Sequence, residues 1–258
     1  MLKQITLSLA IALSISLATA KESGPPPDAE LAGTTARGRM LFEYDLAAWH
    51  STDAVLALKP VKGSVARYVA KKSGGKWVVA YGRFNDQHDK FLVVYEATQG
   101  VSLENFTVKK FDPPLEDAGF YYRGAEAIDT ALKDFQGEKR PHNVAILPAE
   151  SQQIYVYIVP AQTEKGVYPL GGDVRYLISP DGSKIMEKRQ LHLTIIEFKD
   201  TGKPMQAADA WHAHTLSDVP EDTDVFHVLT RSPSLPEQVR TKDHIYEVQV
   251  DGTIKRLK

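Results

Sequence analysis

The chain has 258 residues, of which 25% are charged, and its formal net charge is −2 at pH 7. A chain this close to neutral lacks the basic surface that nucleic-acid-binding domains use, so we expect no nucleic-acid partner. The sequence contains no cysteine. This excludes disulfides, thiol catalysis and zinc sites built from cysteine.

The first twenty residues have the pattern of a cleavable secretory signal peptide. Lys3 gives a positive start, residues 5–17 form an apolar stretch, and Ala18-Thr19-Ala20 matches a small-residue cleavage site. The stretch is shorter than the ~20 residues that span a bilayer, and no later segment reaches that length without charge. We therefore expect a periplasmic or secreted bacterial protein without a membrane span, with its mature part starting at Lys21.

Behind the signal peptide, residues 21–38 contain Pro25-Pro26-Pro27 and are predicted to form a flexible leader. From Arg39 to about Leu58 apolar residues recur at helical spacing, which predicts either one helix or two helices separated by a break at the N-cap-like residues 51–53. We expect residues 39–258 to form a single domain, with a sub-boundary near residues 137–141 as the alternative.

Most of the remaining chain is predicted to be β structure. Three runs rich in Val, Tyr, Phe and Trp predict an antiparallel meander over residues 65–70, 76–84 and 90–97. After Pro113-Pro114 a second helix is expected, with Tyr121, Ala125, Ile128, Leu132 and Phe135 on one face and its end at Gly137. Further strands are expected at 143–147, 154–159, 174–179, 184–198, 209–215, 224–231, 245–250 and 253–257. The sequence therefore predicts an α+β fold, mainly antiparallel sheet with two helical regions.

The strongest chemical signal is a His-x-His pair, since five of the eight histidines lie between residues 192 and 244. In a strand, His212 and His214 point to one face while Trp211 points to the other, toward the core. Two such imidazoles can bind one divalent metal ion. The nearby choices for a further ligand are Asp218, Asp222, Asp224, His227 and His192. The alternative is a half-exposed surface pair without a metal.

The segment after the histidine pair is acidic. Residues 217–224 hold four acids around Pro220, namely Asp218, Glu221, Asp222 and Asp224. Clustered carboxylates repel one another unless a cation relieves them, and a metal ion or arginines such as Arg231 and Arg240 would do so. The alternative is an ordinary solvated turn.

Residues 212–224, HAHTLSDVPEDTD, resemble a degenerate form of the JAMM (MPN-type) metalloprotease motif. The resemblance implies zinc bound by His212, His214 and Asp224, a serine that assists the oxyanion, and an upstream glutamate as general base. The interval to Asp224 is one residue shorter than in the family, and Glu221 or Asp222 stands at the serine position. The family also has a helix where residues 224–231 predict a strand. For the base, four choices stay open: Glu150, Glu164, Glu187 and Glu197.

These features support two hypotheses about function. The first, slightly favoured, is a non-catalytic binding or accessory module of the cell envelope, whose partner is an envelope protein or a small ligand. The second is a hydrolase that uses His212, His214 and Asp224 to hold zinc or another divalent metal. Such an ion would lower the pKa of a bound water toward ~7. No other cofactor is indicated.

Overall fold

The computed structural model describes residues 28–200 and 210–258; the predicted signal peptide and residues 21–27 of the predicted leader lie outside these ranges. The described residues form three α-helices and fourteen strands, an α+β fold made mainly of antiparallel sheet, as the sequence predicts. No helix among them has the length and apolar character needed to cross a membrane.

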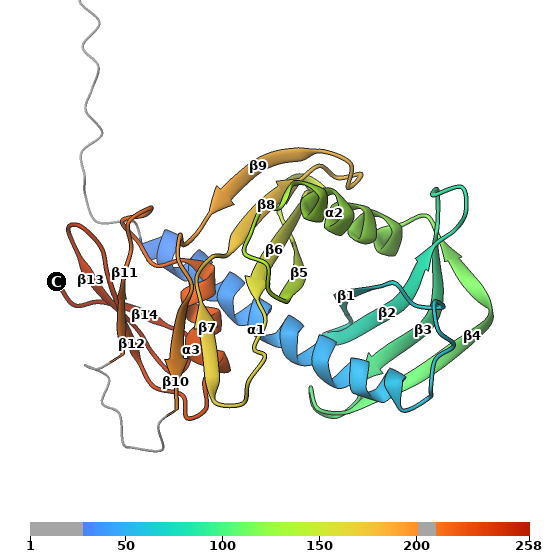
Figure 1. Ribbon diagram of the computed structural model, residues 1–258, viewed down its shortest axis with the longest axis horizontal. Helices are drawn as coiled ribbons and strands as arrows, with labels where there is room; N and C mark the ends of the chain where they lie inside the picture. Colours follow the sequence, from blue (N-terminus) through green and yellow to red (C-terminus); the bar gives the residue numbers. More distant parts are fainter. Residues whose placement is uncertain (1–27, 201–209) are drawn as a thin grey trace, which may run out of the picture.

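The first helix, α1 (Asp28–Leu56), is longer than predicted. The prediction of a flexible leader is wrong from Asp28 onward. Of the two alternatives for residues 39–58, the structure has the single helix, without a break at residues 51–53. The reason is tertiary, because Thr34, Thr35 and Gly38 are buried and Gly38 lies against the last helix of the chain. In Figure 1 α1 runs from the C-terminal strands to the first sheet, so it connects the two ends of the molecule.

The first sheet is an antiparallel meander of four strands, not three, in the order β1 (Arg67–Ser73), β2 (Lys76–Phe84), β3 (Phe91–Gln99) and β4 (Phe106–Asp117). Pro113 and Pro114 precede the predicted helix, as expected, but they lie within β4, a strand that the sequence did not predict. This strand is at the edge of the sheet, where a missing N–H is tolerated. Its pairing with β3 is also interrupted between Lys110 and Leu115, where the prolines lie.

The second helix, α2 (Phe120–Asp134), confirms the predicted position and buries Tyr121, Ala125 and Ile128. A second antiparallel sheet follows, in the order β5 (His142–Pro148), β6 (Ile154–Pro160), β8 (Val174–Ile178) and β9 (Ile185–Gln190). The short 3-10 helix η1 (Glu150–Gln152) connects β5 and β6. Helix α2 contacts both sheets, and one buried apolar cluster includes residues of α1, α2 and both sheets.

The C-terminal part consists of a two-stranded ribbon and a third sheet. The ribbon pairs β7 (Val167–Leu170) with β10 (Ile196–Lys199). The sheet has the order β11 (Trp211–Ala213), β12 (Glu237–Arg240), β13 (Ile245–Val248) and β14 (Ile254–Arg256), with β11 and β12 parallel. The single strand predicted for residues 184–198 is wrong, because it divides into β9 and β10, which belong to different sheets.

The strand predicted for residues 224–231 is also wrong, because α3 (Asp222–Thr230) covers this segment. Its Val and Phe residues favour a strand, but a capping box outweighs that preference. The Glu221 side chain accepts a backbone N–H at Asp224, and the Asp224 carboxylate accepts the Glu221 N–H. Val225 and Val228 then pack against β12 and β13 in a second buried cluster.

We predict that Gly38→Ala lowers the free energy of unfolding by about 1–3 kcal/mol, because added carbon overpacks this contact. A Cβ at Gly38 would lie 2.4 Å from Val225 Cβ and 2.6 Å from the Asp222 carbonyl oxygen. Gly33→Ala in the same helix is the control, since its Cβ would meet only the flexible end of Arg37, at 3.2 Å. Urea unfolding measures both. A Gly38→Ala protein as stable as the control would contradict the packing of α1 on α3.

Candidate metal centre

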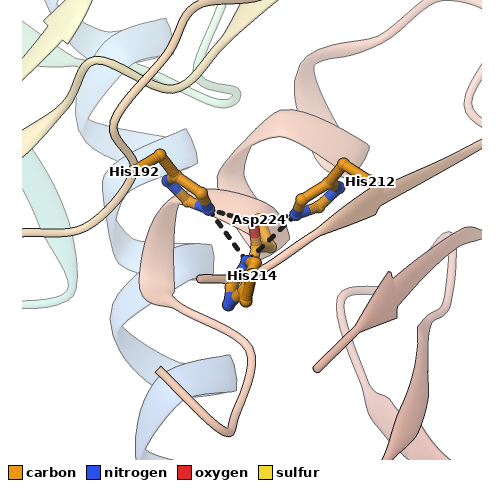
Figure 2. Close-up of side chains that lie close together, drawn as sticks. All are labelled: His192, His212, His214 and Asp224. Atoms are coloured by element: carbon orange, nitrogen blue, oxygen red, sulfur yellow. Dashed lines mark hydrogen bonds and ion pairs between the residues drawn. The ribbon is translucent and has the colours of Figure 1, made fainter. Parts of the chain in front are cut away.

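Four buried side chains converge on one point: His192, His212, His214 and Asp224 (Figure 2). One ligand atom from each lies within 4.8 Å of the others. His214 Nε2 is 2.9 Å from His192 Nε2 and 3.0 Å from His212 Nε2. The Asp224 carboxylate lies 3.1 Å from the Nε2 atoms of His192 and His212 and 3.2 Å from that of His214. The structure therefore brings His212, His214 and Asp224 together and, of the other candidate ligands, adds only His192 to the group; Asp218, Asp222 and His227 are not part of it.

The four residues come from three separate segments. His212 lies in β11 and His214 directly follows it, while Asp224 is in the first turn of α3 and His192 follows β9. The two histidines of the pair share a face, as period-two spacing requires. The prediction that Trp211 points to the core is wrong, however. Both histidines are buried, whereas Trp211 is 47% exposed and stacks under the Arg240 guanidinium. The alternative of a half-exposed surface pair is wrong.

Each imidazole is held through its Nδ1 atom by an acceptor outside the cluster. His192 Nδ1 is 2.8 Å from Asp173 Oδ1, and His212 Nδ1 is 2.7 Å from Glu237 Oε1. His214 Nδ1 is 2.9 Å from the carbonyl oxygen of Val219. Carboxylate and carbonyl oxygens accept hydrogen bonds, so Nδ1 carries the proton in each ring. In the neutral form Nε2 therefore carries the lone pair, the arrangement found in metal-binding histidines.

The fourth group, Asp224, has a buried oxygen without a hydrogen-bond partner. Its Oδ2 accepts the backbone N–H of Glu221 at 2.7 Å. Its Oδ1 is buried and receives no hydrogen bond from the described residues, although two imidazole Nε2 atoms lie 3.1 Å away. A buried anionic oxygen is costly unless a positive partner faces it. Asp224 therefore adds a fourth electron-pair donor aimed at the same point.

The carboxylates around the rings favour positive charge at the site. Burial alone would lower the pKa of His212, but Asp224 and Glu237 raise this pKa to about 9. Burial would likewise lower the pKa of His192, yet Asp173 and Asp224 hold it well above its usual value. The pKa of Asp224 is well below its usual range, because the three imidazoles outweigh its burial. Either protons or a metal ion can supply the charge that these groups attract.

Two acids that orient the rings, Asp173 and Glu237, were missed by the sequence analysis. Each is 1% exposed. Glu237 lies in β12, and besides His212 it contacts His227 Nδ1 at 3.0 Å and Arg231 Nη1 at 2.9 Å. Neither residue belongs to a motif. Their role follows only from the pairing of β12 with β11 and from the position of His192 beside the start of β8.

The acidic segment is mostly buried, so its interpretation as a solvated turn is wrong for three of the four acids. Glu221, Asp222 and Asp224 are 1–3% exposed, while Asp218 is exposed. Their negative charge at the N-terminus of α3 is favourable to the helix dipole. The buried carboxylates also require positively charged partners. These partners are not Arg231 and Arg240, which the sequence suggested.

Asp222 pairs with two arginines and a tyrosine. Its carboxylate is 2.9 Å from Arg37 Nε and 2.8 Å from Arg175 Nη1, and it accepts the Tyr157 hydroxyl at 2.7 Å. Glu221 pairs with Arg189. The arginines therefore come from α1, β8 and β9. Arg231, which the sequence suggested for this role, pairs with Glu237.

A pocket of about 210 Å³ opens beside the cluster. The three histidines form part of its lining, and the other lining residues are neutral and come from the end of β7, residues 191–196 and residues 213–215. Apart from the histidines, the described lining contains no acid or base. The four glutamates considered as general base are all exposed, and none lines this pocket: Glu150, Glu164, Glu187 and Glu197.

Comparisons with known protein families, curated proteins and solved structures found no match for this chain. The resemblance of residues 212–224 to the JAMM motif therefore rests on these residues alone and stays a prediction. The helix that starts at Asp222 agrees with the helix implied by the resemblance. The closeness of His192 to the other three residues is not part of the implied set.

We predict that Asp222→Asn lowers the free energy of unfolding by about 3 kcal/mol, because it leaves two arginines without their buried carboxylate. Asp218→Asn removes a charge from the same segment at an exposed position, and its effect is expected within about 0.5 kcal/mol. Equilibrium unfolding in urea measures both variants. Equal, small losses would show that the Asp222 contacts do not hold α3 in place.

Proposed function

We propose that this chain is a metalloprotein that binds one divalent transition-metal ion through His192, His212, His214 and Asp224. The observation that carries the proposal is the orientation of the three rings. Each has its Nδ1 on an acceptor, so three Nε2 lone pairs and an unpartnered carboxylate oxygen face the same point. Three imidazoles and one carboxylate suit zinc and other first-row metals.

The net charge of the residues in and around the cluster favours a divalent cation. With neutral imidazoles, the cluster and its supporting residues contain three carboxylates, those of Asp173, Asp224 and Glu237. Arg231, on Glu237, supplies one positive charge. A divalent cation would balance the remaining two. The positive charge could instead come from extra protons on the rings. Each ring would then have an N–H at Nε2, and these groups would crowd around the Asp224 carboxylate, because neighbouring Nε2 atoms are only about 3 Å apart.

The function that we place first is therefore metal binding by an exported envelope protein; its export rests on the pattern of residues 1–20. A metal-dependent hydrolase is the second candidate. It is favoured by the pocket, because three of the four proposed ligands line it and an accessible metal can activate a bound water. It ranks second because no residue has been assigned to take the proton from that water.

The first test is metal content. The mature chain, purified without a histidine tag and offered zinc, is expected to retain about one equivalent after dialysis. The variant His212→Ala/His214→Ala is expected to lose this metal. Elemental analysis by plasma mass spectrometry measures both, and chelation of the native protein should lower its melting temperature by removing a ligand of the folded state.

The matched control also removes two histidines, His50 and His88, by substitution with alanine. His50 stacks on Trp49 and His88 pairs with Glu126, both away from the cluster. This variant is expected to keep its metal. Metal well below one equivalent in the native protein, unchanged in His212→Ala/His214→Ala, would refute the proposed site.

A second test addresses the residue that orients His192. We expect Asp173→Asn to weaken metal affinity about 10–100-fold, because the carboxylate fixes the ring and raises its basicity. Competition with a chromophoric chelator measures the affinity. Asp134→Asn removes an acid that pairs with Lys188 outside the cluster and should leave the affinity unchanged. If Asp173→Asn binds metal as tightly as the native chain, then His192 is not a ligand held in this way.

A further inference from the structure

We infer that the metal keeps a coordination position open toward the pocket, and that the pocket takes a small ligand with an oxygen donor and an apolar body. This inference rests on the proposed metal site and goes beyond it. It concerns what the site binds in addition to the metal.

The spacing of the four ligand groups leaves room for a further ligand. With metal–ligand bonds of ~2.1 Å, neighbours at right angles lie ~3.0 Å apart, whereas tetrahedral neighbours lie ~3.4 Å apart. Four separations among the three Nε2 atoms and Asp224 Oδ1 are 2.9, 3.0, 3.1 and 3.1 Å. These values are nearer to the right angles of a six-coordinate shell, in which four protein groups leave two neighbouring positions, enough for a ligand that binds through one or two oxygens.

The open position faces the pocket because the ligand groups are distributed unevenly. His192, His212 and His214 line the pocket, whereas Asp224 does not. The His212, His214 and Asp224 side chains are each 1% exposed, so exposure does not separate them, but Asp224 Oδ2 faces away from the pocket lining and accepts the Glu221 N–H at the start of α3. Asp224 therefore occupies the buried side of the centre, opposite the side on which a ligand enters.

The walls of the pocket select an apolar body for that ligand. Leu170, Leu191, Leu193 and Ile196 contribute side chains, and no charged side chain joins them among the described lining residues. Leu193 is 63% exposed and Ile196 is 42% exposed, so large apolar groups stand in water beside the site. A ligand with an apolar body would cover them, while a charged body would lose hydration without gaining a partner.

The size of the pocket limits the ligand to a small molecule. A volume of about 210 Å³ equals that of about seven water molecules at ~30 Å³ each. One wall is closely packed backbone, since a Cβ at Gly171 would lie 2.1 Å from the Thr194 carbonyl oxygen. We expect room for one ring or a short chain attached to the donor group.

Two hydroxamic acids with the same donor group test the inference on the full mature chain loaded with cobalt(II). Acetohydroxamic acid carries only a methyl group, whereas benzohydroxamic acid carries a ring. Both are expected to change the visible absorption of the bound cobalt, which reports a new ligand on the metal. The benzo compound should bind about tenfold tighter or more, because its ring is buried against the leucines.

A pair of variants locates the apolar contact. Leu193→Asp/Ile196→Asp is expected to keep one equivalent of cobalt but to lose the preference for the ring. Val61→Asp/Val101→Asp makes the same changes at exposed valines away from the pocket and should keep the preference.

Three outcomes would overturn the inference. They are equal affinity for both hydroxamates, a preference that survives in Leu193→Asp/Ile196→Asp, and an unchanged spectrum with both compounds in protein that holds a full equivalent of cobalt. Failure of the proposed metal site is a separate result, because the native chain would then hold no cobalt before any hydroxamate is added.

Discussion

The arrangement of the C-terminal half depends on the buried carboxylates in the first turn of α3. Asp222 holds arginines of α1 and β8 and a tyrosine of β6, and Glu221 holds an arginine of β9. Two residues beyond Asp222, Asp224 projects into the histidine cluster. The contacts that bury two of these acids therefore also determine where the third one points. Because each buried carboxylate needs a positive partner, the helix start has one favourable position relative to α1 and the second sheet.

The histidine cluster likewise depends on several elements of the C-terminal half. His192 follows the last strand of the second sheet, His212 belongs to the third sheet, and Asp224 belongs to the helix that packs on that sheet. These segments meet only after both sheets and α1 are assembled. A metal bound there would link them directly, and its binding would then be coupled to the stability of this half. The supporting acids, Asp173 and Glu237, come from the same two sheets and hold the rings in the orientation that a metal requires.

The surroundings of the centre distinguish the two functional hypotheses. On the buried side, imidazoles, acids and an arginine form ion pairs with one another, while the pocket side is neutral and partly apolar. These surroundings are consistent with the proposed metal site and with a small neutral ligand beside it. A hydrolase of the JAMM type would need a glutamate beside the metal-bound water, and the glutamates considered for that role lie on the surface. The structure thus favours binding over catalysis as the primary proposal.

The sequence by itself determined the elements whose signals are local. The bounds of β2, the position of α2, the hairpin between β8 and β9 and the shared face of His212 and His214 all follow from side-chain period and turn residues. It also placed Asp224 beside the histidine pair as a ligand hypothesis. Only the tertiary structure decided that α1 starts at Asp28, that residues 222–230 are helical, and that the histidines and not Trp211 are buried. The tertiary structure also decided which of the other candidate ligands joins the pair, namely His192, and it alone revealed Asp173 and Glu237, which no local pattern marks. Each of these outcomes depends on partners distant in sequence, and their contact energies outweigh local preference.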